Sequence, residues 1–232
     1  MSDRDAPDSP PSDPHGRSNG PRTLVIGVLG GIASGKSAVA RLLAGPDGEV
    51  LDADRNAHAA LESPALREKL VEHFGEAVLA PPDAPPNARG ERPVDRAALA
   101  RVVFDRPEAR KLLEGWIHPV VRARLTESLA DAHRRHVPRV VLDVPLLLEN
   151  ADEHGLLEPC DFLVYVETPA EARDARAVRD RGWTVGEVAR REATQMPQEA
   201  KRARADVVID NDGDLEALAA ATHRALQTLL GS

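Results

Sequence analysis

Apolar runs and amphipathic segments alternate along most of this chain. Five short runs rich in β-branched residues are typical of strands that are buried on both faces of a sheet. Between them, apolar residues recur at helical spacing, as in the stretch that ends at Gly45. This alternation predicts an α/β fold in which helices cover both faces of a parallel sheet. The expected strands are TLVIGVLG (23–30), EVLDAD (49–54), RVVLD with the apolar extension VPLLLE (139–149), CDFLVYVET (160–168) and DVVIDN (206–211).

Three parts of the chain depart from this alternation. Residues 1–21 are rich in Pro, Ser and Asp and hold no apolar stretch, which predicts a disordered tail and not a signal peptide. Residues 56–135 show helical patterns, interrupted by a Pro-rich segment, 81–93, that predicts a loop. A further helical stretch, rich in arginine, covers about 169–204. We therefore expect one folded unit, 22–232, that carries a large helical insertion.

Composition excludes several classes of protein. The chain has 232 residues, a formal net charge of −8 and one cysteine. One cysteine cannot form an internal disulfide or a multi-cysteine zinc site, so a reducing compartment is expected, and we place the protein in the cytoplasm. The acidic balance gives no general attraction to nucleic acid. No apolar run approaches the roughly 20 residues that a membrane span needs, so no membrane partner is expected.

A glycine-rich loop carries the clearest chemistry. The segment GGIASGKS (30–37) fits the pattern G-x-x-x-x-G-K-[ST] and lies between an expected strand and an expected helix. Glycines let backbone N–H groups face phosphate oxygens, and the start of the following helix adds partial positive charge. In this pattern the lysine, Lys36, reaches the β- and γ-phosphates, and the hydroxyl of Ser37 is placed to bind Mg²⁺. The loop predicts a three-layer P-loop NTPase fold that binds a nucleoside triphosphate.

The loop alone does not identify the reaction. A switch GTPase would carry the guanine-reading sequence Asn-Lys-x-Asp, and none of the four lysines of this chain lies in such a context. A small ATP-dependent kinase is the better fit. Two alternatives stay open: a kinase for another small hydroxyl compound or nucleoside monophosphate, and a nucleotide-dependent binding module that phosphorylates no small molecule.

Three carboxylates are candidates for the chemistry beside this loop. Asp52 and Asp54 stand two residues apart at the end of an expected strand, which would place them on one face at the carboxyl edge of the sheet. A carboxylate there can accept a proton from the acceptor hydroxyl. The alternative is helix capping, because a helix is expected from about Asn56. Asp143 ends another strand, where it either holds Mg²⁺ through water or is only a polar strand end.

Taken together, these motifs resemble the dephospho-coenzyme A kinases. The resemblance covers about residues 22–230 and leaves out little more than the tail. The order of the motifs is more specific than the P-loop alone, which many kinases share. The segments that carry it are GGIASGKS (30–37), DAD (52–54), DRAALARVVF…WIHPVV (95–121), DVPLLLE (143–149) and QMPQEAKRARADVVIDN (195–211).

The resemblance implies a P-loop core, a helical insert at about 56–135 that binds the coenzyme, and a lid at about 169–204. It also implies transfer of the γ-phosphoryl group of ATP to the 3′-hydroxyl of dephospho-coenzyme A, with Mg²⁺. We expect the protein to be a monomer. Asp54 matches the proposed general base, and Lys36 and Arg176 are the other expected catalytic residues. Ser37 and Asp143 are the expected metal ligands. The expected nucleotide contacts are Gly31, Ile32, Ala33, Ser34, Gly35, Lys36, Ser37, Ala38, Arg179 and Asn211.

Several arginines of the expected lid are candidates for phosphate contacts. Arg173, Arg176 and Arg179 recur every three residues, which suggests one helix face directed at phosphates, with Arg181 as a further candidate. A charged face exposed to solvent is the alternative for any arginine-rich helix.

Overall fold

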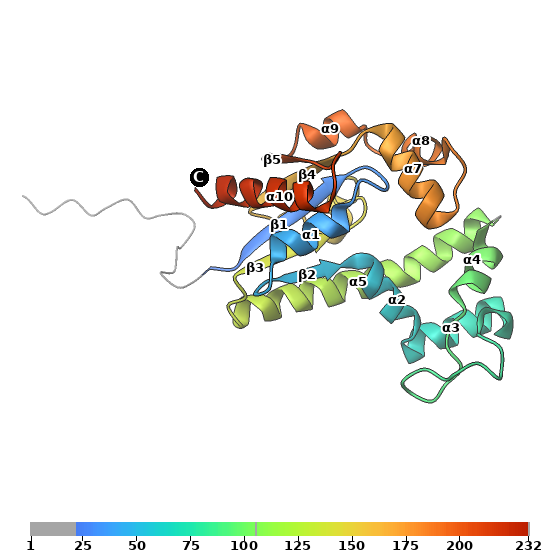
Figure 1. The fold of residues 1–232 in the computed structure, drawn as a ribbon. Coiled ribbons are helices and arrows are strands. Elements are labelled where there is room, and N and C mark those ends of the chain that lie inside the picture. The colour runs from blue at the N-terminus through green and yellow to red at the C-terminus, as the bar shows by residue number, and fades with distance from the viewer. Residues whose placement is uncertain (1–21, 105, 232) are drawn as a thin grey trace, which may run out of the picture.

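The computed structural model describes residues 22–104 and 106–231, so the predicted tail, 1–21, lies outside the described residues. Five parallel strands form one sheet in the order β2-β3-β1-β4-β5, and the predicted α/β fold is confirmed (Figure 1). Because all strands run the same way, their carboxyl ends meet at one edge. The strands are β1 (Leu24–Gly30), β2 (Glu49–Asp52), β3 (Arg139–Asp143), β4 (Phe162–Glu167) and β5 (Val207–Asp210).

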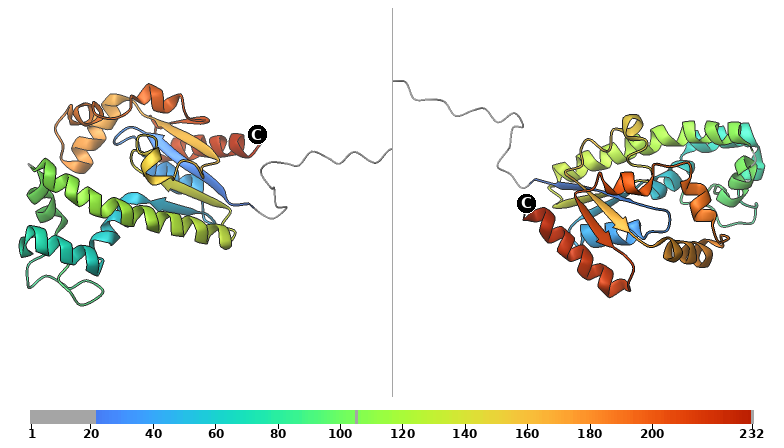
Figure 2. Two further views of the ribbon diagram at one scale, coloured as in Figure 1. Left: turned by 180° about the vertical axis from the view of Figure 1, so that it is seen from behind. Right: turned by 90° about the horizontal axis from the view of Figure 1, so that it is seen from above.

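Helices cover both faces of this sheet, which gives three layers (Figure 2). Helices α1 (Lys36–Ala44) and α10 (Leu215–Leu230) pack on one face, where Val39, Leu43 and Leu218 are buried against the strands. The other face is covered by one end of α5 and by the segment after β3, which contains the short helix α6 (Ala151–His154). The single cysteine, Cys160, packs against this second core, and burial raises the pKa of its thiol to about 12.

A helical segment, residues 53–134, builds a separate small core beside the sheet (Figure 1). Leu66, Leu70, Val78, Leu99 and Leu113 are buried together there. Its elements are α2 (Ala53–Leu61), α3 (Pro64–Phe74), the 3₁₀ turn η1 (Glu76–Val78), α4 (Arg96–Phe104) and α5 (Pro107–Arg134).

The Pro-rich segment 81–93 is a loop, as predicted, and Glu62 anchors it to this core. The carboxylate of Glu62 accepts hydrogen bonds from Asn87 Nδ2 and from the backbone N–H of Val94, each at 3.0 Å. The backbone carbonyl of Glu62 accepts a further bond from Arg89. The loop is therefore held at both its tip and its end.

Helix α5 belongs to two cores at once. Leu113 near its start lies in the core of the helical segment, whereas Leu125 and Leu129 lie against the sheet. Val121 packs against both cores. The helix continues through Pro119, although proline in a helix interior commonly ends or kinks the helix.

The arginine-rich stretch forms three helices and not one. They are α7 (Ala170–Arg181), α8 (Glu187–Glu192) and α9 (Gln198–Arg202). Gly182 and Gly186 both adopt positive φ and separate α7 from α8, and Pro197 precedes α9. Gly182 ends α7, whereas Gly186 and Pro197 stand directly before α8 and α9. Glycine adopts positive φ without strain, and proline cannot donate the hydrogen bond that would continue a preceding helix. Among the described residues, no helix is long and apolar enough to span a membrane.

Candidate active site

The P-loop connects the end of β1 to the start of α1 and wraps around the Lys36 ammonium group. Lys36 Nζ donates hydrogen bonds to the carbonyl oxygens of Gly30 at 3.0 Å and Gly31 at 2.7 Å. Gly35 precedes the helix with φ 92°, a conformation that glycine adopts without strain. Burial lowers the pKa of Lys36 to about 8, and the negative charge of Asp143 opposes that shift. The ammonium group is thus positioned inside the loop, where the motif places its phosphate contact.

A second layer of side chains holds the loop in shape. The carbonyl oxygen of Ser34 accepts hydrogen bonds from Thr168 Oγ1 at 2.9 Å and Asn211 Nδ2 at 2.7 Å. Arg176 donates to the same carbonyl at 3.4 Å and to the backbone carbonyl of Asn211 at 3.1 Å. Two of the predicted site residues therefore contact the P-loop. Asn211 does so from the end of β5, and Arg176 from the middle of α7.

The carboxylates collect at the carboxyl edge of the sheet, as expected, but their local structure differs from the prediction. Asp52 and Asp143 are directly opposite each other in the β2–β3 pairing. The strand ends at Asp52, and α2 begins at Ala53, earlier than the expected helix start near Asn56. Asp52 caps this helix, because its side chain accepts from the backbone N–H of Arg55 at 2.9 Å. Asp54 lies in the first turn of α2 and not on the strand, so the strand-face argument was wrong.

These three carboxylates influence one another. Asp143 is buried, with 7% of its surface exposed. Partial burial raises the pKa of Asp54, and the negative charges of Asp52 and Asp143 raise it further. A carboxylate with a raised pKa holds a proton more readily, which is the property a general base needs.

The four candidate arginines do not act alike. Arg173 Nη1 forms an ion pair with Glu192 at 2.6 Å directly over Gly31 of the P-loop. Arg176 supports the loop from behind, as described above. Arg179 is exposed and pairs with its neighbour Asp180 at 2.6 Å, so the structure does not bring it to the loop. Arg181 lies at the end of α7 near Trp183. Its positive charge acts to lower the pKa of both Lys36 and Asp54.

A model of the dephospho-CoA kinase family matches residues 24–217 of this chain. The chain belongs to the dephospho-CoA kinase family. A dephospho-CoA kinase of Parasynechococcus marenigrum is 42% identical over 200 residues, which cover 86% of this chain and 93% of the relative. The dephospho-CoA kinase of Thermus thermophilus is 41% identical over 211 residues, which cover 90% and 93%.

Two solved structures resemble the fold of this chain. A crystal structure of a Thermus thermophilus protein is similar with a TM-score of 0.66 and 39% identity, covering 90% of this chain and 97% of that one. A dephospho-CoA kinase of Campylobacter jejuni has a TM-score of 0.62 at 22% identity, covering 89% and 97%, and shares the fold. The predicted resemblance to this family is confirmed, and with it the use of a nucleotide substrate by a P-loop kinase.

The residues present fit a magnesium ion that is bound mainly through substrate. Within the described part of the chain, no group of three or more His, Cys, Asp or Glu residues is arranged to hold a metal ion. Ser37, exposed at the start of α1, and Asp143 instead offer hard oxygen atoms. Mg²⁺ prefers such ligands and commonly takes only one or two from the protein, with phosphates and water supplying the rest.

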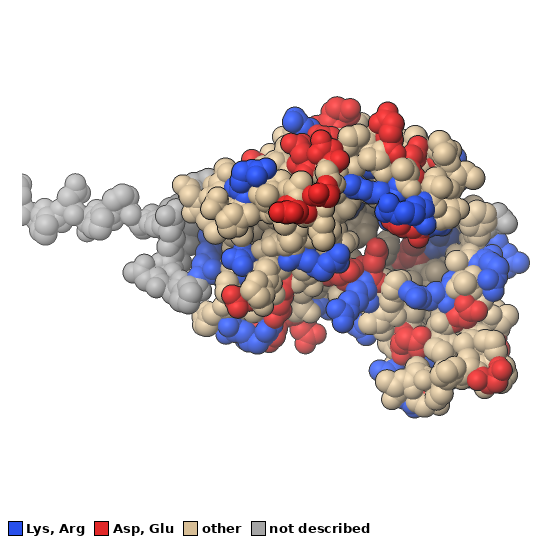
Figure 3. Space-filling view, in the orientation of Figure 1, with Lys and Arg blue, Asp and Glu red and all other residues tan. Residues whose placement is uncertain are grey.

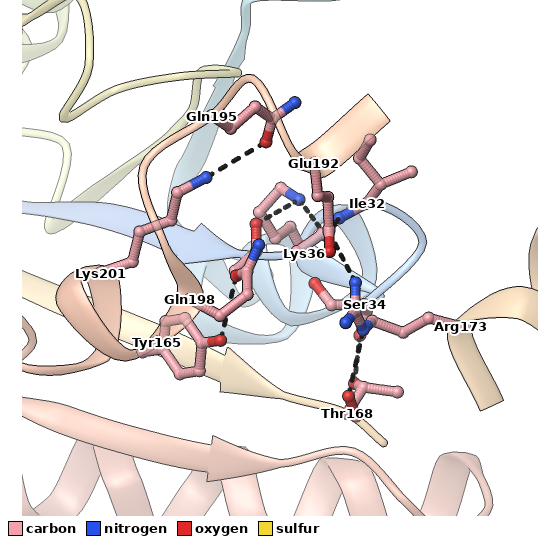
Figure 4. A network of polar contacts seen from close by, with 12 residues as sticks. Ile32, Ser34, Lys36, Tyr165, Thr168, Arg173, Glu192, Gln195, Gln198 and Lys201 are labelled. Atoms are coloured by element: carbon pink, nitrogen blue, oxygen red, sulfur yellow. Dashed lines mark hydrogen bonds and ion pairs between the residues drawn. The ribbon is translucent and has the colours of Figure 1, made fainter. Parts of the chain in front are cut away.

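Three residues of this dephospho-CoA kinase family member were not singled out from the sequence. They are Glu149, Glu192 and Lys201. Glu192 contacts the P-loop at Ile32 (Figure 4), and Lys201 forms an ion pair with Glu149. Glu149 and Lys201 fall inside motif segments, DVPLLLE and QMPQEAK, that suggested their importance without suggesting a contact. Nothing in the local pattern around Glu192 distinguishes it from other charged residues of the stretch.

The surface of the molecule is hollowed between two of its parts. Figure 3 shows a recess between the part of the molecule that carries α7 and α8 and the part that carries α3 and α4, with basic and acidic side chains at its edge. The P-loop and the carboxyl edge of the sheet lie at the inner side of this arrangement (Figure 1).

Proposed function

We propose that this chain transfers the γ-phosphoryl group of ATP to the 3′-hydroxyl group of dephospho-coenzyme A, giving coenzyme A and ADP. The observation that carries the proposal is that the P-loop lysine, Lys36, lies at the same edge of the sheet as Asp54. The chain also belongs to the dephospho-CoA kinase family, whose name describes this reaction. A phosphate-binding cation and a carboxylate with a raised pKa are the two groups that this transfer needs.

In this mechanism Asp54 accepts the proton of the acceptor hydroxyl. The hydroxyl oxygen then forms a bond to the γ-phosphorus while the bond to the β,γ-bridging oxygen breaks and ADP leaves. Lys36 and the P-loop N–H groups stabilise the charge on the transferring phosphoryl group. Ser37 and Asp143 would hold a magnesium ion, which neutralises phosphate charge when bound. We assign acceptor binding to the helical segment 53–134, because Asp54 lies at its start beside the P-loop edge.

Two further assignments accompany this proposal. The P-loop, Asp54 and the lid arginines all come from one chain, so a monomer suffices for catalysis; size-exclusion chromatography with light scattering tests this state. We place the enzyme in the cytoplasm because its single cysteine is a free thiol, which a reducing compartment preserves. Fractionation of the source cells tests the location.

The decisive experiment follows ATP turnover by purified protein with Mg²⁺, with and without dephospho-coenzyme A. We expect release of ADP that depends on this acceptor and is matched by coenzyme A. The variant Asp54→Asn should lose kcat by several orders of magnitude with little change in ATP affinity. ADP release that is indifferent to the acceptor would reject the proposal and favour another acceptor or a nucleotide-dependent binding module.

A further inference from the structure

A carboxylate of the protein itself is bound at the P-loop. Glu192 Oε1 accepts a hydrogen bond from the backbone N–H of Ile32 at 2.6 Å and pairs with Arg173 Nη1 at 2.6 Å (Figure 4). Both side chains are largely buried, with 12% of each exposed. Ile32 is the third residue of the GGIASGKS loop, whose N–H groups serve to bind phosphate oxygens. Glu192 therefore presents to the loop an anion of the kind that a nucleotide would bring.

The surroundings of Glu192 also match those of a bound phosphate oxygen. A guanidinium group and a P-loop N–H are the usual donors to a phosphate, and Glu192 engages one of each. Its oxygen and the Arg173 guanidinium lie so close over Gly31 that a β-carbon there would be 2.6 Å and 2.5 Å from them. The negative charge of Glu192 also acts on Lys36, where it favours the protonated amine. Glu192 thus contacts the N–H of Ile32 and the guanidinium of Arg173, and its charge acts on Lys36.

The helix that carries Glu192 is attached at both ends by turns. Helix α8 has six residues, and Glu192 is its last. Gly182 and Gly186 lie before it, with φ of 66° and 85° and no atom within 4 Å of where a β-carbon would be. After it, the chain passes through Gln195 and Met196 to Pro197, where α9 begins. A short helix between such turns can change its position without disturbing the sheet.

We propose that Glu192 is an internal competitor of ATP, a carboxylate that closes the P-loop and is displaced when the triphosphate binds. This inference rests on the proposed use of ATP. Displacement frees Arg173 for the phosphates and releases α8 from the loop, so that nucleotide binding and lid position are coupled. The contact lowers the affinity for ATP, because binding must first break the two bonds that Glu192 makes.

The test compares the isosteric variant Glu192→Gln with the wild type and with Glu171→Gln. Glu171 is exposed in the first turn of α7, so the control removes the same charge from the same region without touching the loop. Isothermal titration measures binding of ATP, ADP and adenosine in the absence of dephospho-coenzyme A. We expect Glu192→Gln to bind ATP about tenfold more tightly and adenosine with unchanged affinity, because a charge-assisted contact is lost. Glu171→Gln should match the wild type.

Hydrogen–deuterium exchange of the wild-type protein provides an independent measurement. ATP should increase exchange in residues 187–197 while it protects the loop 30–38, and adenosine should do neither. Unchanged or weaker ATP binding by Glu192→Gln would overturn the inference, and weaker binding would mean that Glu192 instead holds Arg173 in position. Slower exchange in 187–197 with ATP would overturn it as well.

These outcomes are separate from those that test the kinase reaction. Acceptor-dependent turnover by the wild type, together with unchanged ATP binding by Glu192→Gln, would leave the proposed function intact and reject the competitor. Tighter ATP binding by the variant, without acceptor-dependent turnover by the wild type, would do the reverse.

Discussion

Lys201 and Glu149 form a buried ion pair that joins two motif segments, and the charge of Lys201 acts on Lys36 in the P-loop. Lys201 Nζ lies 2.7 Å from Glu149 Oε1, and the two side chains are 5% and 16% exposed. Lys201 also donates to Gln195 Oε1 at 3.3 Å, and the Glu149 carboxylate accepts from the backbone N–H of Met196 at 3.3 Å. The pair therefore fixes the chain between α8 and α9 to the segment that follows β3.

Removing one partner of this pair should destabilise the protein strongly. We expect Lys201→Met or Glu149→Leu alone to lower the free energy of unfolding by about 3–5 kcal/mol, because a buried charge is left without a partner. The double variant should lose much less than the sum of the two. Urea unfolding followed by circular dichroism measures all three. Additive losses in the double variant would contradict a direct coupling between the two side chains.

Deprotonation of Lys36 should limit the activity at high pH. Burial lowers its pKa to about 8, and only the ammonium form stabilises the phosphoryl group, so activity falls as the pH rises through that value. We expect kcat/KM for ATP to fall about tenfold per pH unit above it. The variant Lys36→Ala should lose activity by orders of magnitude. Arg41 is exposed on the same helix, so Arg41→Ala should keep the catalytic rate and its pH profile. A flat wild-type profile between pH 7 and pH 10 would contradict this assignment.

The pKa of Asp54 should set the acidic limit of catalysis, and the charge of Asp52 adds to the effect of burial on that pKa. Asp54 must be ionised to accept a proton, and its raised pKa means that activity is lost as the pH falls through that higher value. Asn also caps helices well, so Asp52→Asn keeps the cap of α2 and removes only the charge. We expect this variant to lower the pKa of Asp54 and to move the acidic limb of kcat/KM for dephospho-coenzyme A to lower pH. An unmoved limb would show that Asp52 does not act on the base.

Glu62 should control the order of the Pro-rich loop. Glu62→Ala removes the acceptor for Asn87 and leaves the N–H of Val94 without its partner, at a cost of about 1–3 kcal/mol to the local structure. We expect faster hydrogen exchange and faster proteolytic cleavage in residues 81–94, with the sheet unaffected. Glu68→Ala, an exposed change on α3, is the control and should leave both rates unchanged. Equal rates in the two variants would mean that the loop is held by its other contacts.

The sequence predicted those parts of the fold and site that depend only on residues close together in the chain. The P-loop and the helix stop at Gly45 follow from glycine placement, and the strands follow from continuous apolar runs. The boundary at Asp52 was missed because one residue both ends β2 and caps α2, which leaves no connecting segment to detect. Pro119 did not end its helix because buried residues on both sides hold α5 in place.

Contacts between distant segments could not be predicted in this way. Residues six apart on a helix are rotated by about 120° from each other, so Arg173 and Arg179 face different surroundings despite their regular spacing. Which of them meets the P-loop depends on how the rest of the fold places α7, which bonds to the loop through Arg176. Glu192 lies 160 residues from its partner Ile32, and no periodic pattern encodes such a pairing.

Helix α5, which packs in both cores, connects the helical segment 53–134 to the sheet. Between Pro107 and Pro119 the helix extends about 18 Å from the sheet layer, at 1.5 Å per residue. Pro119 lacks the N–H that would bond to the preceding turn, so the rod is weakest at that point. A bend of about 10° there would carry the far end through about 3 Å, the length of one hydrogen bond. A small angular change at Pro119 would thus move the helical segment 53–134, to which we assign acceptor binding, while the sheet and the P-loop stay fixed.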